Sequence, residues 1–541
     1  MNKILIKKPY QRWLFGGVGF HNSEATMVPI MSKKFYNERV LKCFREISPT
    51  FSRVFAGYAD WTREAMDRFA DYYDETFRKS GTLIYMVPGR MPMPSSDFDL
   101  EEYCEKTAKN LKYLIEERGC TKIRYFCITN ENSVGNTYAY LGDKPEVFAK
   151  YHDALYRAFR RNGVDVGLLA TDCSEVVNFP QIKWAVENID EITDDYCTHL
   201  YLKKYQPGEL EAYDYCKGLF SELTVLARSM QKRYILGEFG IYDRNRISLT
   251  DTPLAMGSDT SYAVVHPEND GIYAVAVAEM ALSVLNSGTF ACAFWTLFDY
   301  PDPFIKENGD TPEEKGRYEV ARFSGHGLQI RYNKNGLIKW CDDEGDYGSR
   351  AALYTMGYMA KFFKKGSRVL ECSWDDEYLR AGAITNGDGS ASICIINWEN
   401  KKKTVDIDLE HELDKPFRRY DFSANDIPYN EFCDLQSYTE QIECNGNISI
   451  ELLPRSVTFL TTDYENRTPT QIQNIRVENG ELLWDMTPDE EHCYYRVYCN
   501  GSQIASTVSE SVEITDPQAT YNVISVDKYG NSGSLDAEEK E

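Results

Sequence analysis

Residues 146–172 read EVFAKYHDALYRAFRRNGVDVGLLATD and contain the unit from which much of this chain is built. Apolar residues recur every three to four positions through Arg161, as they do on one face of a helix. Gly163 follows, and a glycine just past a helix end adopts the left-handed cap at little cost. The run VGLLATD (166–172) then has the length and composition of a buried strand. The stretch therefore predicts a helix that leads through a glycine cap into a strand.

The same unit recurs between about residues 13 and 300. Three further predicted helices end at a glycine, at about 62–80 before Gly81, 100–118 before Gly119 and 271–287 before Gly288. The candidate strands are the apolar runs WLFGGVGF (13–20), FSRVFAGY (51–58), TLIYMVP (82–88), IRYFCITN (123–130), VGLLATD (166–172), YCTHLYL (196–202), RYILGEFG (233–240) and CAFWTLF (292–298). Eight strands that alternate with helices predict a (β/α)₈ barrel over residues 1–350. The alternative is an open doubly wound sheet, but no GxGxxG or Walker-type loop follows the first run.

The pattern changes after a predicted helix near 349–364. Short alternating strands follow, and Asn386 to Gly389 and Asn445-Gly446 are typical hairpin turns between them. Residues 351–465 are therefore predicted to form a β-sandwich. A third unit, 466–541, contains Trp484 and Tyr521 in a pattern that resembles a fibronectin type III sandwich. The expected fold class is an α/β barrel followed by two β-sandwiches.

Composition restricts the partners of this chain. Its 84 Asp and Glu against 60 Lys and Arg give a net charge of −24, which argues against nucleic acid and anionic membranes as partners. Aromatic residues make up 13% of the chain, which suits either aromatic-rich cores or stacking platforms for sugar rings. The 15 cysteines form no CxxC motif, so we expect reduced thiols. The N-terminus lacks an apolar run of signal-peptide length, which predicts a cytoplasmic protein, with a secreted mature form as the alternative. The sequence leaves open whether the chain forms a homo-oligomer.

Two glutamates stand out because each ends an apolar run. Glu131 follows IRYFCITN, and Glu238 lies within RYILGEFG. Both are expected at the carboxyl ends of barrel strands, four and seven, where ligands bind. A charge beside a buried strand is costly unless it serves a purpose; for either glutamate alone, the alternative is a strand-end salt bridge. Two carboxyls that lie close together push their pKa values apart, so that one can stay protonated while the other is ionised, as acid–base chemistry requires.

These residues carry a resemblance to a known group of enzymes. Asn130-Glu131 resembles the Asn-Glu pair that ends strand four in clan A of the glycoside hydrolases, and Glu238 in GEFG resembles the strand-seven nucleophile of that clan. The resemblance covers roughly 13–463 and implies a retaining mechanism with Glu131 as acid/base and Glu238 as nucleophile. Asn132 departs from the proline usual after the acid/base.

Other strand ends agree with the clan pattern. Arg53 ends strand two, where the clan places an arginine that holds the nucleophile. His199 and Tyr201 resemble the His-x-Tyr pair of the β-xylosidase/α-L-iduronidase family, and Trp295 matches a sugar-stacking tryptophan. The resemblance implies that Arg53 and Tyr201 support Glu238. Asn130 is expected to bind the sugar 2-hydroxyl, and His199 to bind a hydroxyl or orient Glu131.

Weaker candidates lie nearby. Asp60 and Trp61, with Tyr58 and Arg90, follow strands two and three and are predicted to contribute one or two residues to the pocket. Asp172 and Asp299 end strands five and eight and are predicted to bind sugar hydroxyls, with a structural role as the alternative. His21 and Asn22 are the candidates at strand one.

The seven histidines show no HExxH motif or close pairing, and no GxSxG motif is present, so the sequence predicts neither a metal nor another cofactor. The expected function is a retaining glycoside hydrolase on an oligosaccharide or glycoside substrate. Exo action of a β-xylosidase or β-glucosidase type is expected, with long loops at 243–269 and 299–348 around the mouth. The alternatives are a barrel that binds glycans without hydrolysing them and a transglycosidase that uses the same residues.

Overall fold

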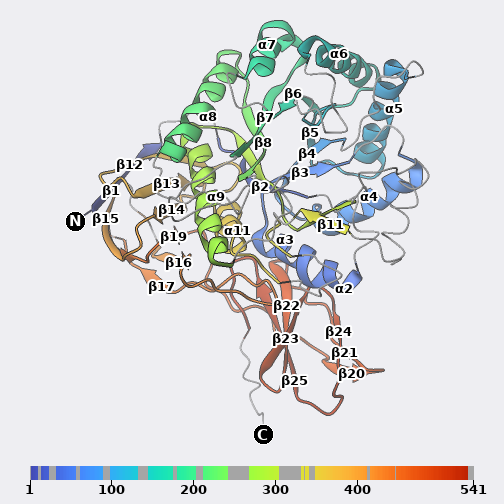
Figure 1. Ribbon diagram of the computed structural model, residues 1–541. Coiled ribbons are helices and arrows are strands. Elements are labelled where there is room, and N and C mark those ends of the chain that lie inside the picture. The colour runs from blue at the N-terminus through green and yellow to red at the C-terminus, as the bar shows by residue number, and fades with distance from the viewer. Residues whose placement is uncertain are drawn as a thin grey trace.

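The computed structural model describes residues 2–9, 14–22, 32–56, 61–88, 98–131, 144–174, 179–202, 211–241, 267–303, 330–333, 336–339, 348–410, 413, 415–444 and 446–533. Its centre is a closed barrel of parallel strands in chain order, in which the last strand pairs with the first (Figure 1). The strands are β2 (Gly17–His21), β3 (Phe51–Phe55), β4 (Leu83–Val87), β5 (Ile123–Phe126), β6 (Gly167–Cys173), β7 (Asp195–Leu202), β8 (Tyr234–Ile241) and β9 (Ala291–Phe294). Each corresponds to one of the eight apolar runs, so the expected barrel is confirmed.

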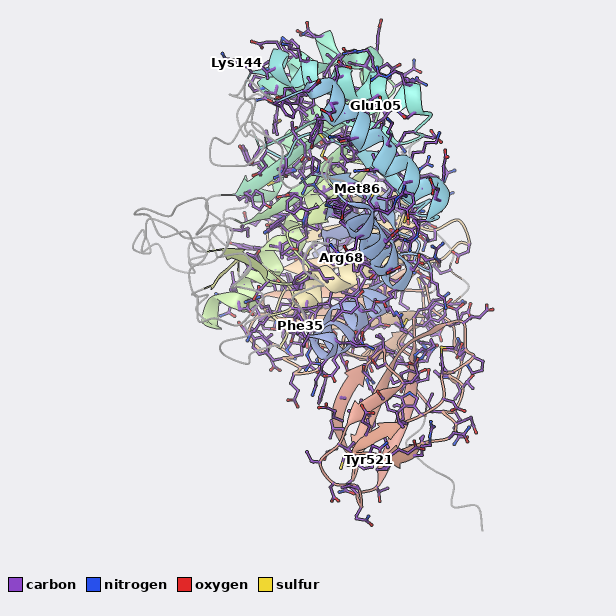
Figure 2. All side chains as sticks on the ribbon, turned by 90° about the vertical axis from the view of Figure 1, so that its right-hand side faces the viewer. Phe35, Arg68, Met86, Glu105, Lys144 and Tyr521 are labelled. Carbon is purple, nitrogen blue, oxygen red and sulfur yellow. The ribbon has the colours of Figure 1, made fainter. Side chains whose placement is uncertain are left out.

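Helical segments follow each barrel strand and cover its outside. In chain order they are α2 (Lys33–Phe35), the π-helix η2 (Tyr36–Val40), α3 (Leu41–Ile47), α4 (Arg63–Thr76), α5 (Leu100–Lys112), the π-helix η3 (Tyr113–Glu117), α6 (Pro145–Asn162), α7 (Pro180–Asn188), the 3₁₀ turn η4 (Asp190–Ile192), α8 (Glu211–Ser229), α9 (Pro267–Ser287) and α11 (Leu353–Phe362). Figure 2 places Met86 of β4 within the barrel and Arg68 and Glu105 on the helices around it. Because all the barrel strands are parallel, their carboxyl ends meet at one mouth of the barrel.

Helix α6 shows how local sequence sets these elements. Pro145 occupies the first turn, where its missing N–H costs nothing. Phe148, Leu155 and Phe159 recur at helical spacing and are buried. Gly163 ends the helix at φ 67°, a conformation that glycine adopts without the steric cost of a Cβ. The predicted helix 146–161 is thus confirmed to within a residue at each end.

A nine-stranded mixed sheet lies beside the barrel, in the order β17-β16-β19-β14-β13-β12-β1-β15-β18. Its strands are β1 (Asn2–Pro9), β12 (Arg368–Trp374), β13 (Leu379–Thr385), β14 (Ala391–Asn397), β15 (Lys403–Leu409), β16 (Phe417–Ser423), β17 (Glu440–Ile442), β18 (Asn447–Leu452) and β19 (Ser456–Thr461). The N-terminal strand β1 is antiparallel to β12 and parallel to β15. The expectation that all of 1–350 belongs to the barrel is wrong for β1, which pairs with the sheet instead. Its short alternation carried no sign of a partner some 370 residues away.

The sheet has two apolar sides. One side encloses its own core, including Ile4, Ile393 and Ile407, as expected of a sandwich. The other contributes Ile396 and Phe459 to the large core around the barrel. Helix α9 of the barrel is joined to the sheet by polar contacts as well: its buried Glu279 pairs with Arg380 and accepts a hydrogen bond from Trp398. The sheet is therefore packed firmly on the barrel.

The last unit consists of two three-stranded sheets, β20-β21-β24 and β23-β22-β25. The strands are β20 (Arg476–Glu478), β21 (Glu481–Leu483), β22 (His492–Cys499), β23 (Ser502–Thr507), β24 (Ser511–Glu513) and β25 (Tyr521–Asp527). Trp484 and Tyr495 lie edge to face in its small core, and Figure 2 shows Tyr521 at the end far from the barrel. The second sandwich is present, and its fibronectin type III identity stays a prediction.

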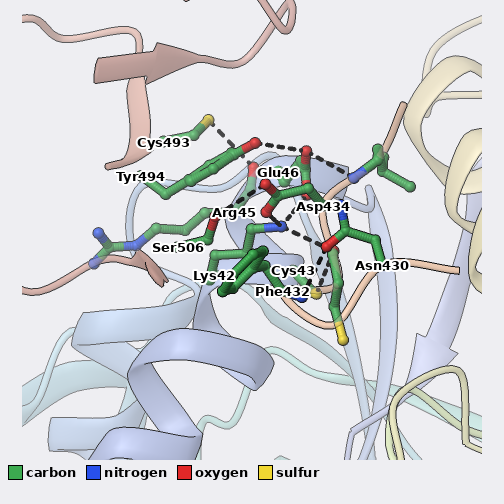
Figure 3. Close-up of polar contacts among 12 residues, drawn as sticks. Lys42, Cys43, Arg45, Glu46, Asn430, Phe432, Asp434, Cys493, Tyr494 and Ser506 are labelled. Atoms are coloured by element: carbon green, nitrogen blue, oxygen red, sulfur yellow. Dashed lines mark hydrogen bonds and ion pairs between the residues drawn. The ribbon is translucent and has the colours of Figure 1, made fainter. Parts of the chain in front are cut away.

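A buried polar cluster joins the three units (Figure 3). Lys42 of α3 is fully buried and pairs with Glu46 at 2.7 Å and Asp434 at 2.6 Å. Arg496 of β22 binds the same Asp434 at 3.0 Å, and the hydroxyl of Tyr494 donates to Glu46. The barrel, the sheet and the terminal sandwich thus share one set of ion pairs.

Fourteen cysteines are described, and all are free thiols, most of them buried. Within the same described ranges, no helix is long and apolar enough to cross a membrane.

Candidate active site

Two glutamates lie at the mouth of the barrel. Glu238 is on β8, and its neighbour in the pairing with β7 is His199. Glu131 follows β5, with a backbone φ of 50°, and its N–H donates to the carbonyl of Asp172 on β6 at 2.9 Å. A side chain at positive φ is strained, and such strain gathers at functional sites.

Glu238 is held by partners from two other strands. The guanidinium of Arg53 on β3 donates to Oε1, and the hydroxyl of Tyr201 on β7 donates to Oε2 at 2.6 Å. Its side chain is 6% exposed. Burial raises the pKa of Glu238, while the positive charges of His199 and Arg53 oppose that rise. The contacts expected from Arg53 and Tyr201 are therefore present.

Glu131 has a different environment. Its Oε1 lies 3.0 Å from Nδ1 of His199, and its side chain is 19% exposed, three times as much as that of Glu238. Of the two roles expected for His199, the orientation of Glu131 is the one the structure shows. The two carboxyls are thus chemically unequal: Glu238 is enclosed and held by Arg53, whereas Glu131 is more open.

His199 itself is fully buried, and Nε2 lies 2.8 Å from Oδ1 of Asp172. Burial alone lowers the pKa of a histidine, but the charges of Asp172 and Glu238 together raise that of His199 to about 10. These charges therefore favour the protonated form of His199.

For Asp172 and Asp299 the structure favours the structural role over the binding of sugar hydroxyls. Asp172 is fully buried against Arg53, His199 and Tyr85. Asp299 is buried as well, and its carboxylate pairs with Arg350 at 2.7 Å. Hydrogen-bond donors of the protein occupy both carboxylates. Those of Asp172 come from neighbouring barrel strands, and Asp299 is bound by Arg350, which comes later in the chain.

The remaining neighbours surround Arg53. Asn130 accepts from Nη2 of Arg53 at 2.6 Å, and Nδ1 of His21 lies 3.0 Å from Nη1. The ring of Trp295 lies 4.4 Å from that of His21, and therefore beside the site as expected. Burial lowers the pKa of His21, and the charge of Arg53 adds to the effect.

Trp61 and Asn22 are the other predicted residues that the structure describes. Trp61 packs on Phe69 of α4 with ring centroids 5.7 Å apart. Asn22 is fully buried, and its backbone N–H donates to Arg53. Tyr58, Asp60, Arg90 and Asn132, and most of the loops 243–269 and 299–348, lie outside the described residues.

The side chains of Glu131, His199 and Glu238 converge, with one oxygen or nitrogen of each within 4.8 Å of the others. This spacing would also suit a metal ion, but both nitrogens of His199 face carboxylates at hydrogen-bond distance. The absence of a metal or cofactor stays a prediction.

Three members of the site were missed in the sequence. Tyr85 on β4 donates to Asp172 at 2.6 Å, and the thiol of Cys197 lies 3.2 Å from the same carboxylate. A Cβ on Gly237 would lie 2.6 Å from the sulfur of Cys197 and 3.1 Å from Oδ1 of Asp172, so only glycine fits there. A polar tyrosine inside the apolar run LIYMV and the glycine directly before Glu238 were the available signals.

No protein-family model and no curated protein matches this sequence. Solved structures do match the fold. A GH51 α-L-arabinofuranosidase from Thermotoga petrophila RKU-1 has a TM-score of 0.58 and 13% identity, covering 86% of this chain and 100% of that one. A GH30 endoxylanase from Clostridium papyrosolvens C71 has a TM-score of 0.56 and 11% identity, covering 85% and 99%. A GH30 subfamily 8 xylanase, Xyn30A, from Clostridium acetobutylicum has a TM-score of 0.54 and 13% identity, also covering 85% and 99%. At these identities the likeness establishes a shared fold over most of the chain.

Proposed function

We propose that this protein is a retaining glycoside hydrolase in which Glu238 is the nucleophile and Glu131 the acid/base. The observation that carries the proposal is the pair of carboxyls at the mouth, whose nearest side-chain oxygens lie within 4.8 Å. A retaining enzyme needs its carboxyls about 5–5.5 Å apart, whereas an inverting enzyme needs about 6.5–9.5 Å. The named fold neighbours, all of them glycoside hydrolases, support the same reaction class.

The roles follow from the environments. Arg53 and Tyr201 hold the Glu238 carboxylate in place, so it can attack the anomeric carbon. Glu131 gives its proton to the leaving oxygen as the glycosidic bond breaks, and a glycosyl ester on Glu238 results. Glu131, now a carboxylate, takes a proton from water, which attacks the anomeric carbon and releases Glu238. Trp295 packs against His21, which lies next to Arg53, and we propose that a sugar ring stacks on it.

We further propose exo action on a β-linked or configurationally equivalent oligosaccharide, of a β-xylosidase or β-glucosidase type. Support comes from the long connections that follow β8 and β9, because both strands end at the mouth. An oligosaccharide labelled at its reducing end tests this: exo action releases single sugars from the other end, and endo action releases labelled fragments of mixed length.

The test of the reaction is Glu238→Ala on a panel of nitrophenyl glycosides. We expect turnover to vanish, and azide to restore it with a glycosyl azide of inverted configuration. Glu131→Gln should slow poor leaving groups more than activated aryl ones, because only the former need the proton. Glu279→Gln, a buried glutamate of α9 away from the mouth, is the matched control.

Wild-type rates in both Glu238→Ala and Glu131→Gln would refute the assignment. Saturable glycan binding without hydrolysis across the panel would favour the non-catalytic glycan-binding barrel. Products that carry an added acceptor sugar would identify a transglycosidase, which would use the same two glutamates.

A further inference from the structure

Asp172 contacts Arg53, which binds Glu238, and His199, which binds Glu131. It is the residue before the last in β6, is fully buried and has a backbone φ of 55°. Oδ2 accepts from Arg53 at 2.8 Å, and Oδ1 faces Nε2 of His199 at 2.8 Å and the hydroxyl of Tyr85 at 2.6 Å. Such a buried carboxylate is tolerable only because cations and donors surround it.

The contacts of Asp172 lead to each glutamate separately. Arg53 binds Asp172 through Nη2 and Glu238 through Nη1. His199 faces Asp172 through Nε2 and Glu131 through Nδ1, at 3.0 Å. The backbone carbonyl of Asp172 also accepts the N–H of Glu131. Asp172 thus fixes the cation beside the nucleophile, the imidazole beside the acid/base, and the main chain of the acid/base itself.

The geometry sets where the protons lie on His199. Nε2 faces a carboxylate whose pKa is lowered, against the effect of burial, by Arg53 and His199, so Asp172 is ionised and Nε2 bears a hydrogen. Nδ1 faces Glu131 at 3.0 Å and Glu238 at 3.7 Å, both of them acceptors when ionised. Among the described residues, the opposing cation is Arg53 on β3, and the other titratable groups nearby are His21 on β2, Tyr85 on β4, and Cys197 and Tyr201 on β7. Two carboxylates face one guanidinium in each half of the reaction, Asp172 and Glu238 in the free enzyme and Asp172 and Glu131 in the glycosyl-enzyme, and this balance favours an imidazolium.

We propose that Asp172 is a positioning residue that keeps His199 in its imidazolium form, so that Nδ1–H stays directed at Glu131 through both halves of the reaction. The proposal rests on the proposed function. When Glu131 has given its proton to the leaving group, Glu238 is esterified and its charge is gone. The Nδ1–H of His199 then donates to the new Glu131 carboxylate and stabilises it until it takes a proton from water. His199 itself neither gains nor loses a proton.

The first measurement needs no catalysis. Imidazole ¹⁵N spectra of the full chain, with the His199 signals assigned by their loss in His199→Gln, report its protonation. We expect His199 in the wild-type protein to keep imidazolium shifts from pH 5 to 9. In Asp172→Asn, which keeps an acceptor but removes the charge, we expect its pKa to fall by at least two units and its titration to enter that range. A wild-type His199 that titrates near 6.5 would overturn the proposal, even if the variant failed to fold.

The second measurement is the pH profile of aryl glycoside hydrolysis. We expect Asp172→Asn to lower kcat about 10- to 100-fold, the range for one hydrogen bond to a charged group. We also expect a new ionisation in kcat/KM that coincides with the pKa of His199 from the spectra. Asp195→Asn is the control, because Asp195 is equally buried and paired with Arg233 but begins β7 at the opposite end of the barrel.

An Asp172→Asn variant with a wild-type pH profile and an untitrated His199 would overturn the role of Asp172. If instead the glutamate variants leave turnover intact, the proposed function fails, and the spectra still decide whether Asp172 sets the charge of His199.

Discussion

Tyr201, like Arg53, donates a hydrogen bond directly to the carboxylate of Glu238. Its hydroxyl lies 2.6 Å from Oε2 of Glu238. Burial raises the pKa of Glu238, and this hydrogen bond is among the contacts that oppose the rise. The nucleophile must be ionised, so activity is lost as the pH falls through that pKa.

We therefore expect Tyr201→Phe to lower kcat/KM about 10- to 100-fold and to move the acidic limb of its pH profile to higher pH. Profiles between pH 4 and 8 measure both effects. Tyr36→Phe is the control, since the Tyr36 hydroxyl pairs with Thr76 in the helical layer. An unmoved acidic limb in Tyr201→Phe would contradict the role assigned to its hydroxyl.

Among the elements, helix α3 contains a buried charge, that of Lys42, which depends on two ion-pair partners. Lys42 is fully buried, and burial lowers its pKa, but Asp434 and Glu46 more than reverse the effect. Loss of one partner from a buried ion pair typically costs about 3–5 kcal/mol, because the other charge stays buried. Lys42 therefore stabilises the contact between α3 and the segment around residue 434.

We expect Lys42→Met to lower the free energy of unfolding by about 3–5 kcal/mol in urea titrations. Lys106→Met is the control: its pair with Glu102 is exposed, so the change should stay within about 1 kcal/mol. Adding Asp434→Asn to Lys42→Met should recover part of the loss. Equal effects of Lys42→Met and Lys106→Met would contradict the importance of burial.

The same contact predicts how the stability of the protein changes with pH. Burial raises the pKa of Asp434, but Lys42 and Arg496 bring it below its ordinary value. A lowered carboxyl pKa contributes stability that is present above the unfolded pKa and is lost as pH falls through the folded pKa. Acid should therefore weaken this contact.

For the whole molecule, the shared ion pairs couple the terminal sandwich to the barrel. Arg496 and Tyr494 of β22 bind Asp434 and Glu46, and Lys361 of α11 donates to the carbonyl of Lys528. We expect calorimetry of the full chain to show the terminal sandwich melting together with the barrel. Arg496→Met should separate an earlier transition from the main one. A separate early transition in the wild-type protein would contradict the coupling.

The barrel was predictable because its signals are local. Each apolar run, such as RYILGEFG, indicates by its own composition that its strand is buried. A glycine such as Gly163 marks the end of the helix directly before it. The partner of β1 was not predictable, since strand pairing depends on segments hundreds of residues away. Helices α7 and α8 were not assigned individually, although helical connections were expected between most strands.

Glu131 and Glu238 could be selected from 84 acidic residues because each ends a strand and matches a clan motif. Position along the chain did not reveal which groups surround them. For Asp172 the sequence left both a sugar ligand and a structural role open, and Tyr85 and Gly237 were not singled out.

Local periodicity and the residues at strand ends were enough to identify the barrel and its two carboxyls, because alternation and capping are properties of neighbouring residues. The charge states of the site depend on contacts such as Arg53 with Glu238, 185 residues apart in the chain. Such contacts exist only once eight strands close into a ring. The tertiary structure therefore decided that Asp172 contacts both Arg53 and His199 and that the pKa of His199 is raised, because burial and the directions of hydrogen bonds set both.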